Sequence, residues 1–157
     1  MSRFLRVREQ PRRGIFCPLE TDVKDFSIIL FDGFEPLDAF GPAEIIGETP
    51  DDYALQYFSQ NGGIVESHQN IKAVTRPFCE MDRSGILLIP GGNGTRTLAA
   101  DDQWIEQLKD LSDKAPYVLS VCTGSALLAK AGLSDGRKAT SNKMVFSWAA
   151  SQGTAVK

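Results

Sequence analysis

The chain contains few of the residues that build metal sites and disulfide frameworks: one histidine and three cysteines among 157 residues. Cys17, Cys79 and Cys122 are odd in number and irregularly spaced, which fits neither a disulfide framework nor a zinc site. The sequence therefore predicts a reducing compartment, which we take as the cytoplasm, and no bound metal. Cys17 and Cys79 stand in no recognisable motif, so we expect neither to be catalytic.

The chain also lacks an excess of basic residues and any long apolar run. Its 17 Lys and Arg against 20 Asp and Glu give a formal net charge of −3, which argues against nucleic acid or an anionic membrane as a partner. No apolar segment approaches the length of a membrane-spanning helix. A composition of 42% hydrophobic and 24% charged residues is typical of one globular domain, for which we expect a small-molecule substrate.

The first 24 residues differ from the rest. They are rich in arginine, contain prolines and glycine, and show no clear periodicity, so we predict a flexible arm over residues 1–24 and a domain over residues 25–157. A mitochondrial leader is the alternative for this arm, which Glu9 and the scarcity of hydroxyl residues weaken.

From residue 25 onward, short apolar runs alternate with segments of helical spacing. Residues 26–31 form a continuous apolar run, as expected for a strand covered on both faces. Further strands are predicted at 53–59, 85–90 and 117–121, with a turn at 61–63 and a small hairpin of 64–66 and 71–74 around His68. Four helices are predicted. The first spans residues 42–46 and begins with Pro42, and the second runs from a cap at Asp101 or Asp102 through Leu111. The third spans residues 125–131 and ends before Gly132, and the fourth runs from a cap at Asn142 to about Ser151. Trp104 and Trp148 fit amphipathic helix faces and are predicted to be core.

This alternation predicts an α/β fold with a doubly wound, mostly parallel sheet and helices on both faces. In such sheets ligands bind beyond the carboxyl ends of the strands. Three segments reach that edge, at residues 32–38, 91–95 and 122–125.

Cys122 lies where an apolar strand gives way to an Ala- and Leu-rich helix. A thiol at such an elbow projects from the sheet and faces the positive end of the helix, which favours the thiolate. The alternative is a buried cysteine that acts as a small hydrophobic residue.

The other two segments offer complementary groups. The N–H groups of Gly91, Gly92 and Thr123 can approach a ligand anion, although a glycine pair can also serve only a tight turn. Asp38 lies in an apolar stretch, where its carboxyl, packed beside a thiol, would tend to stay protonated and could hydrogen-bond the sulfur or deliver a proton. Its alternative is a helix N-cap.

Three ordered motifs carry a family resemblance: Leu37-Asp38 with Gly41-Pro42, Ile89-Pro90-Gly91-Gly92, and Val121-Cys122-Thr123-Gly124-Ser125. They resemble the ThiJ/PfpI superfamily, also called the Parkinsonism-associated deglycase superfamily, of class I glutamine amidotransferase-like proteins. Within it the chain most resembles the isocyanide hydratase-like branch.

The resemblance implies a flavodoxin-like domain, a homodimer, and a lyase that needs neither a metal nor an organic cofactor. Cys122 would be the nucleophile, Asp38 the proton carrier, and the N–H groups of Gly92 and Thr123 the oxyanion pocket, with the Thr123 side chain beside the thiol. The thiolate would attack an isocyanide carbon, and water would release an N-substituted formamide. Glyoxalase-like action on small ketoaldehydes and a non-enzymatic redox- or ligand-sensing domain are the alternatives.

The chain departs from the family pattern in two places. Where many relatives carry a histidine near the cysteine, this chain has Asn142, and its single histidine, His68, is predicted to have a surface or packing role. A peptidase-like Cys/His pair is therefore not expected. Relatives also continue through another strand pair and a closing helix, so we expect a C-terminally truncated domain whose activity requires that segment.

Overall fold

The computed structural model describes residues 23–153 of the chain. The flexible arm was predicted over residues 1–24, and residues 1–22, which include Cys17, lie outside the described part. Lys24, the last residue of the predicted arm, is the first residue of a strand. Within residues 23–153 the structure holds no helix with the length and apolarity needed to cross a membrane.

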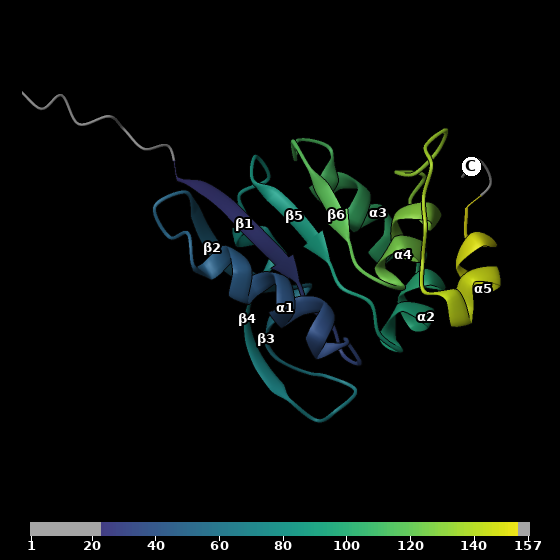
Figure 1. Ribbon diagram of the computed structural model, residues 1–157, viewed down its shortest axis with the longest axis horizontal. Coiled ribbons are helices and arrows are strands. Elements are labelled where there is room, and N and C mark those ends of the chain that lie inside the picture. Colours follow the sequence, from purple (N-terminus) through teal and green to yellow (C-terminus); the bar gives the residue numbers. More distant parts are fainter. Residues whose placement is uncertain (1–22, 154–157) are drawn as a thin grey trace, which may run out of the picture.

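The centre of the fold is one six-stranded sheet with the order β3-β4-β2-β1-β5-β6 (Figure 1). The strands are β1 (Lys24–Ile29), β2 (Tyr53–Ser59), β3 (Asn61–Glu66), β4 (Lys72–Pro77), β5 (Ile86–Ile89) and β6 (Val118–Ser120). All neighbours pair in parallel except β3, which runs antiparallel to β4 at one edge. The mostly parallel α/β sheet predicted from the sequence is thus confirmed.

Helices lie between some of these strands and follow the last of them. They are α1 (Pro36–Gly47), α2 (Gly94–Ala99), α3 (Asp102–Ser112), α4 (Gly124–Lys130) and α5 (Phe146–Ala150), with single 3₁₀ turns η1 (Phe78–Glu80) and η2 (Lys143–Val145). In Figure 1, α2, α4 and α5 gather beyond the ends of β5 and β6, and α4 contacts both α2 and α5.

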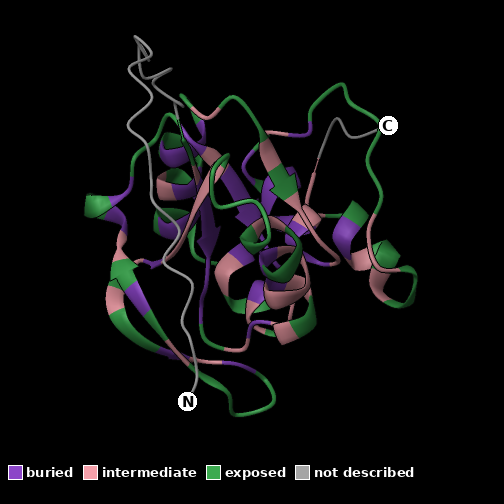
Figure 2. Ribbon diagram, turned by 60° about the vertical axis from the view of Figure 1, so that its left-hand side comes forward, coloured by how far each residue is buried: buried purple, intermediate pink, exposed green. Residues whose placement is uncertain are grey.

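β1 is one of the two central strands, and its four consecutive residues Phe26–Ile29 are buried, so both of its faces are covered. This burial is why the strand reads as a continuous apolar run rather than as an alternating pattern. In Figure 2 the buried segments lie in the interior of the molecule, including β1 and β5, whereas β3, β4, β6 and the outer loops are largely exposed or intermediate.

α3 forms as the sequence predicts. The Asp101 carboxylate accepts a hydrogen bond from the Trp104 N–H at 3.1 Å, which satisfies a free amide at the helix start. Trp104 is 2% exposed and meets Phe31 edge to face, so it is a core residue as predicted. Trp148 is partly buried against the same core.

Two expectations were wrong. The first helix begins at Pro36 rather than Pro42, because Pro36 fits the first turn and Pro42 is accommodated inside the helix. Residues 61–63 form the start of β3 rather than a separate turn: Gly62 and Gly63 adopt φ of +70° and +86°, which glycine accepts within an edge strand.

The loops that leave β1 and β5 are joined to each other by backbone hydrogen bonds. The Glu35 N–H donates to the Gly91 carbonyl at 2.9 Å, and the Gly94 N–H donates to the Gly33 carbonyl at 3.2 Å. These bonds bring two of the three predicted segments together at the carboxyl edge of the sheet.

Candidate active site

Cys122 occupies a tight elbow between β6 and α4. Its φ is +52°, a left-handed conformation that side chains other than those of glycine rarely adopt. The fold keeps this strained backbone because α4 packs closely on β5: a Cβ on Gly124 would lie 2.3 Å from the Ile89 carbonyl oxygen. The half-buried thiol therefore projects from the end of the strand at the start of a helix, as the sequence predicts.

Asp38 lies in the first turn of α1, two residues after Pro36, and not at the cap position, which Glu35 occupies. The alternative that Asp38 is a helix N-cap is therefore wrong. Its Oδ2 accepts a hydrogen bond from the Gly91 N–H at 3.1 Å. Burial raises the pKa of this carboxyl above its ordinary value, the Gly91 hydrogen bond opposes that shift, and the charge of Glu35 adds to it.

The Cys122 thiol lies near the Asp38 carboxyl and lowers the pKa of that acid, as the smallest of the four influences on it. Because Gly91 has no side chain, the Asp38 carboxyl and the backbone of Thr123 can approach each other closely. A Cβ at Gly91 would lie 2.7 Å from Asp38 Oδ2 and 2.7 Å from the Thr123 nitrogen, distances too short for any side chain. The glycine is thus needed where the carboxyl and the elbow approach each other.

Asn142, which follows Cys122 in the sequence, also contacts the sulfur. Its Nδ2 donates to Cys122 Sγ at 3.2 Å, while its Oδ1 accepts from the Met144 N–H at 2.9 Å. Because the Met144 N–H can only donate, it fixes which end of the amide faces the sulfur. Asn142 therefore caps η2, close to its predicted role, and also supplies a hydrogen-bond donor to the thiol.

The three backbone amides predicted to bind an anion differ in their hydrogen-bond partners. The Gly91 N–H is taken by Asp38, and the Gly92 N–H donates to Thr123 Oγ1 at 3.0 Å. Among the described residues, the Thr123 N–H donates to no protein acceptor. Anion binding by Gly92 and Thr123 stays a prediction, and for Gly92 it requires the Thr123 hydroxyl to move.

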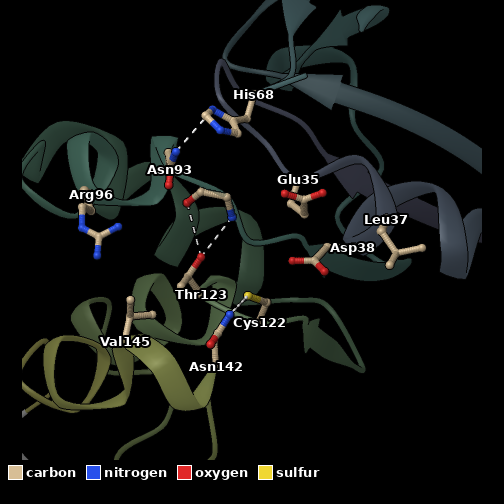
Figure 3. Close-up of a pocket in the computed structure, with 11 residues that line it drawn as sticks. Glu35, Leu37, Asp38, His68, Asn93, Arg96, Cys122, Thr123, Asn142 and Val145 are labelled. Atoms are coloured by element: carbon tan, nitrogen blue, oxygen red, sulfur yellow. Dashed lines mark hydrogen bonds between the residues drawn. The ribbon is translucent and has the colours of Figure 1, made fainter. Parts of the chain in front are cut away.

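A cavity of about 320 Å³ opens onto these groups (Figure 3). Its walls come from α1, the hairpin loop, α2, the elbow and the η2 segment; they are Glu35, Leu37, Asp38, His68, Gly92, Asn93, Arg96, Cys122, Thr123, Asn142 and Val145. The cavity therefore contains the predicted Cys122, Asp38 and Thr123 together, with Gly92 in the wall and Gly91 directly behind Asp38.

The structure adds residues that the sequence did not single out for the site. His68, expected on the surface or in packing, is exposed but lines the cavity, where its Nδ1 lies 3.3 Å from the Asn93 amide nitrogen. Arg96 comes from α2, a helix that was not predicted at all. For Asn142 a signal existed in the sequence, because it stands where many relatives carry a histidine near the cysteine.

The described part of the chain contains no cluster of metal-ligating side chains. Across residues 23–153, no three His, Cys, Asp or Glu side chains come together in a way that could hold an ion.

The fold and this site define a flavodoxin-like α/β protein with a cysteine at a strand-to-helix elbow beside a half-buried carboxyl. The sequence profile of the DJ-1/PfpI family matches residues 24–156, so the chain belongs to the DJ-1/PfpI family. The ThiJ/PfpI resemblance read from its motifs is thereby confirmed.

Individual relatives agree with this assignment. The chain is 30% identical over 114 residues to an isonitrile hydratase of Pseudomonas putida, an alignment that covers 73% of this chain and 50% of that protein. It is also 30% identical over 116 residues to a deglycase of Thermococcus kodakarensis, covering 73% of this chain and 69% of that protein. The chain thus spans about half the length of the isonitrile hydratase.

Among solved structures, a ThiJ/PfpI family protein from Pseudomonas syringae superimposes with a TM-score of 0.77 at 26% identity. That alignment covers 95% of this chain and 63% of the other chain. The flavodoxin-like arrangement of strands and helices is therefore shared with this family member.

Proposed function

We propose that the protein is a cysteine enzyme that hydrates isocyanides to N-substituted formamides without a cofactor. One observation carries the proposal: the Cys122 sulfur lies between the Asp38 carboxyl and the Asn142 amide. A proton acceptor and a neutral hydrogen-bond donor thus flank the nucleophile. The similarity to an isonitrile hydratase supports the same reaction.

The first half of the reaction uses Asp38 as a proton carrier. The carboxylate takes the thiol proton, the sulfur forms a bond to the isocyanide carbon, and Asp38 returns the proton to that same carbon. The product is a thioimidate in which the isocyanide has lost no atom. A carboxyl whose pKa is raised by burial suits this role, since it must hold the proton and then release it.

The second half consumes one water. Water adds to the thioimidate carbon, a proton goes to the nitrogen, and the carbon–sulfur bond breaks to give the formamide and the free cysteine. The Asn142 N–H, 3.2 Å from the sulfur, stabilises the departing thiolate. The sum of both halves is the addition of water to the isocyanide, which requires no oxidant or reductant.

The arrangement disfavours amide hydrolysis. A cysteine peptidase pairs its thiol with a histidine that protonates the leaving amine. Among the described residues, His68 is hydrogen-bonded to Asn93 and not to Cys122, and the position beside the sulfur holds the non-titrating amide of Asn142. An isocyanide has no leaving amine, so its hydration does not need that histidine.

A second candidate is action on small ketoaldehydes, favoured by the similarity to a deglycase. The same thiol would attack an aldehyde carbon, and Asp38 would move the proton between the adjacent carbons. A non-enzymatic sensing domain, the remaining alternative, predicts neither product.

The test compares the two substrates directly. Purified protein is incubated with an aryl isocyanide or with methylglyoxal, and formamide formation and methylglyoxal loss are followed. We expect faster formamide formation, its loss in Cys122→Ser, and its retention in Cys79→Ser, because Cys79 is exposed and outside the cavity. Faster methylglyoxal turnover would move the protein to the second candidate, and equal activity of Cys122→Ser would overturn both.

A further inference from the structure

Arg96 is the permanent cation in the wall of the cavity that contains Cys122. It belongs to α2, which follows the Gly91-Gly92 segment. Figure 3 shows its side chain on the side of the cavity away from Glu35 and Asp38, with Cys122 and Thr123 between the two sides. The cavity is therefore negative at one end and positive at the other.

The two charged ends differ in their hydrogen-bond partners. Glu35 is held by Gln69, whose amide lies 3.1 Å from each carboxylate oxygen. Arg96, in contrast, takes part in no ion pair among residues 23–153, whereas Arg76 pairs with Glu80 and Arg83 with Asp110. The guanidinium has no counterion within the described chain.

Trp148 holds this guanidinium in place. The Arg96 Cζ lies over the Trp148 ring, 4.9 Å from its centre, which is a cation–π contact. In the described part of the chain, the hydrogen bonds and ion pairs of arginine side chains are made by Arg76 and Arg83, so the N–H donors of Arg96 have no protein acceptor. A planar fork of free donors matches a carboxylate.

We propose that Arg96 binds an anionic group of the substrate, so that the preferred substrates are small electrophiles that carry a carboxylate. The volume of about 320 Å³ lies at the low end of ligand cavities, which suits a compact molecule that reaches from the thiol to the guanidinium. The identity of the electrophile rests on the proposed function, whereas the anion subsite does not.

The experiment measures alkylation of Cys122 by iodoacetate and by iodoacetamide. Both reagents form the same sulfur–carbon bond and release iodide, but only iodoacetate carries a carboxylate. In Arg96→Gln we expect the iodoacetate-to-iodoacetamide rate ratio to fall about three- to tenfold, the effect of losing one partly solvated charge contact. Arg96→Lys should retain part of the ratio, because it keeps the charge without the fork.

Arg83→Gln is the matched control, since it removes the same charge from an ion pair outside the cavity and should leave the ratio unchanged. An unchanged ratio in Arg96→Gln would overturn the subsite. Turnover of isocyanoacetate against isocyanoacetamide then separates the two claims: a retained alkylation effect without formamide from either compound would refute the proposed reaction and leave the subsite standing.

Discussion

The sulfur of Cys122 has a hydrogen-bond donor on one side and a carboxyl on the other, and the two neighbours act on it in different ways. Asn142 donates to the sulfur, a hydrogen bond that stabilises a thiolate when one forms, whereas the Asp38 carboxyl lies where it can take the thiol proton. Neither group is an imidazole. The reactivity of the thiol should therefore depend on an amide, which does not titrate, and on one acid.

Replacing Asn142 tests the amide. Asn142→Ala removes a hydrogen bond that would be worth about 1.5–3 kcal/mol to the thiolate that reacts, so alkylation of Cys122 at mildly acidic pH should slow about tenfold or more. Asn142→Asp keeps an acceptor for the Met144 N–H but places a negative charge beside the sulfur, and should slow it further.

The readout for both variants is the pH profile of iodoacetamide labelling, followed by peptide mapping. Asn61→Ala is the control, since Asn61 is exposed on β3 and outside the cavity. A profile for Asn142→Ala that overlays the wild-type profile would show that the amide has a structural role only.

Asp38 should lower the stability of the folded chain at neutral pH. Its pKa is raised above the ordinary value of 3.8, so the folded state holds this proton more tightly than the unfolded state. Ionisation therefore costs stability as the pH rises through the raised pKa, and the cost is absent at pH values below 3.8. Asp38→Asn removes the ionisation and keeps an oxygen for the Gly91 N–H.

We expect Asp38→Asn to melt about 1–3 °C higher than the wild type near pH 7 and to lose this advantage at low pH, while turnover falls about 100-fold. Thermal denaturation at both pH values measures the difference. A variant that melts lower at neutral pH, or an advantage that persists in acid, would contradict the burial argument.

At the scale of the elements, the strands and α3 were predictable because their signals are local. β1 is a continuous apolar run and α3 has a cap followed by helical spacing. α2 was missed because Gly-Thr-Arg-Thr has poor helix propensity, and the helix is held instead by contacts with α3 and α4. Pro42 was mistaken for a helix start because an internal proline is uncommon.

The same distinction between local signals and long-range packing applies to the residues of the site. Cys122, Asp38 and the glycine pair were found because parallel strands deliver their carboxyl ends to one edge of the sheet. The contacts of Asn142 and Arg96 depend on how η2 and α5 pack against α4 and α2, far along the chain, and no local pattern encodes that packing.

The approach of α1 to the elbow is the packing feature that most constrains the site. Gly91→Ala would force its Cβ to within 2.7 Å of Asp38 Oδ2 and of the Thr123 nitrogen, so both must shift. A displacement of about 1 Å at reacting groups can cost 100-fold in rate, and we expect a loss of that order.

Gly47→Ala at the end of α1 is the matched variant, because its Cβ would meet nothing within 4 Å. It should keep full activity and change the free energy of unfolding by less than about 1 kcal/mol. Steady-state kinetics together with denaturant unfolding measures both variants. Full turnover by Gly91→Ala would show that the carboxyl and the elbow tolerate a wider separation.

For the whole molecule, the groups proposed to react, Cys122, Asp38 and Asn142, all come from one chain and line one cavity. The homodimer implied by the family resemblance stays a prediction, to be tested by light scattering over a range of concentrations. If it forms, the labelling rate of Cys122 should not change on dilution below the dimer dissociation constant. A rate that falls with dissociation would mean that the partner subunit contributes to the site.

The most direct test of the central claim is the mass of the covalent intermediate. Protein mixed with an isocyanide is quenched in acid, and the intact mass and the modified peptide are determined. The account predicts an increase equal to the whole isocyanide, located on Cys122, present in Cys79→Ser and strongly reduced in Asp38→Asn. Formamide release by a Cys122→Ala variant, or an adduct confined to another residue, would contradict it.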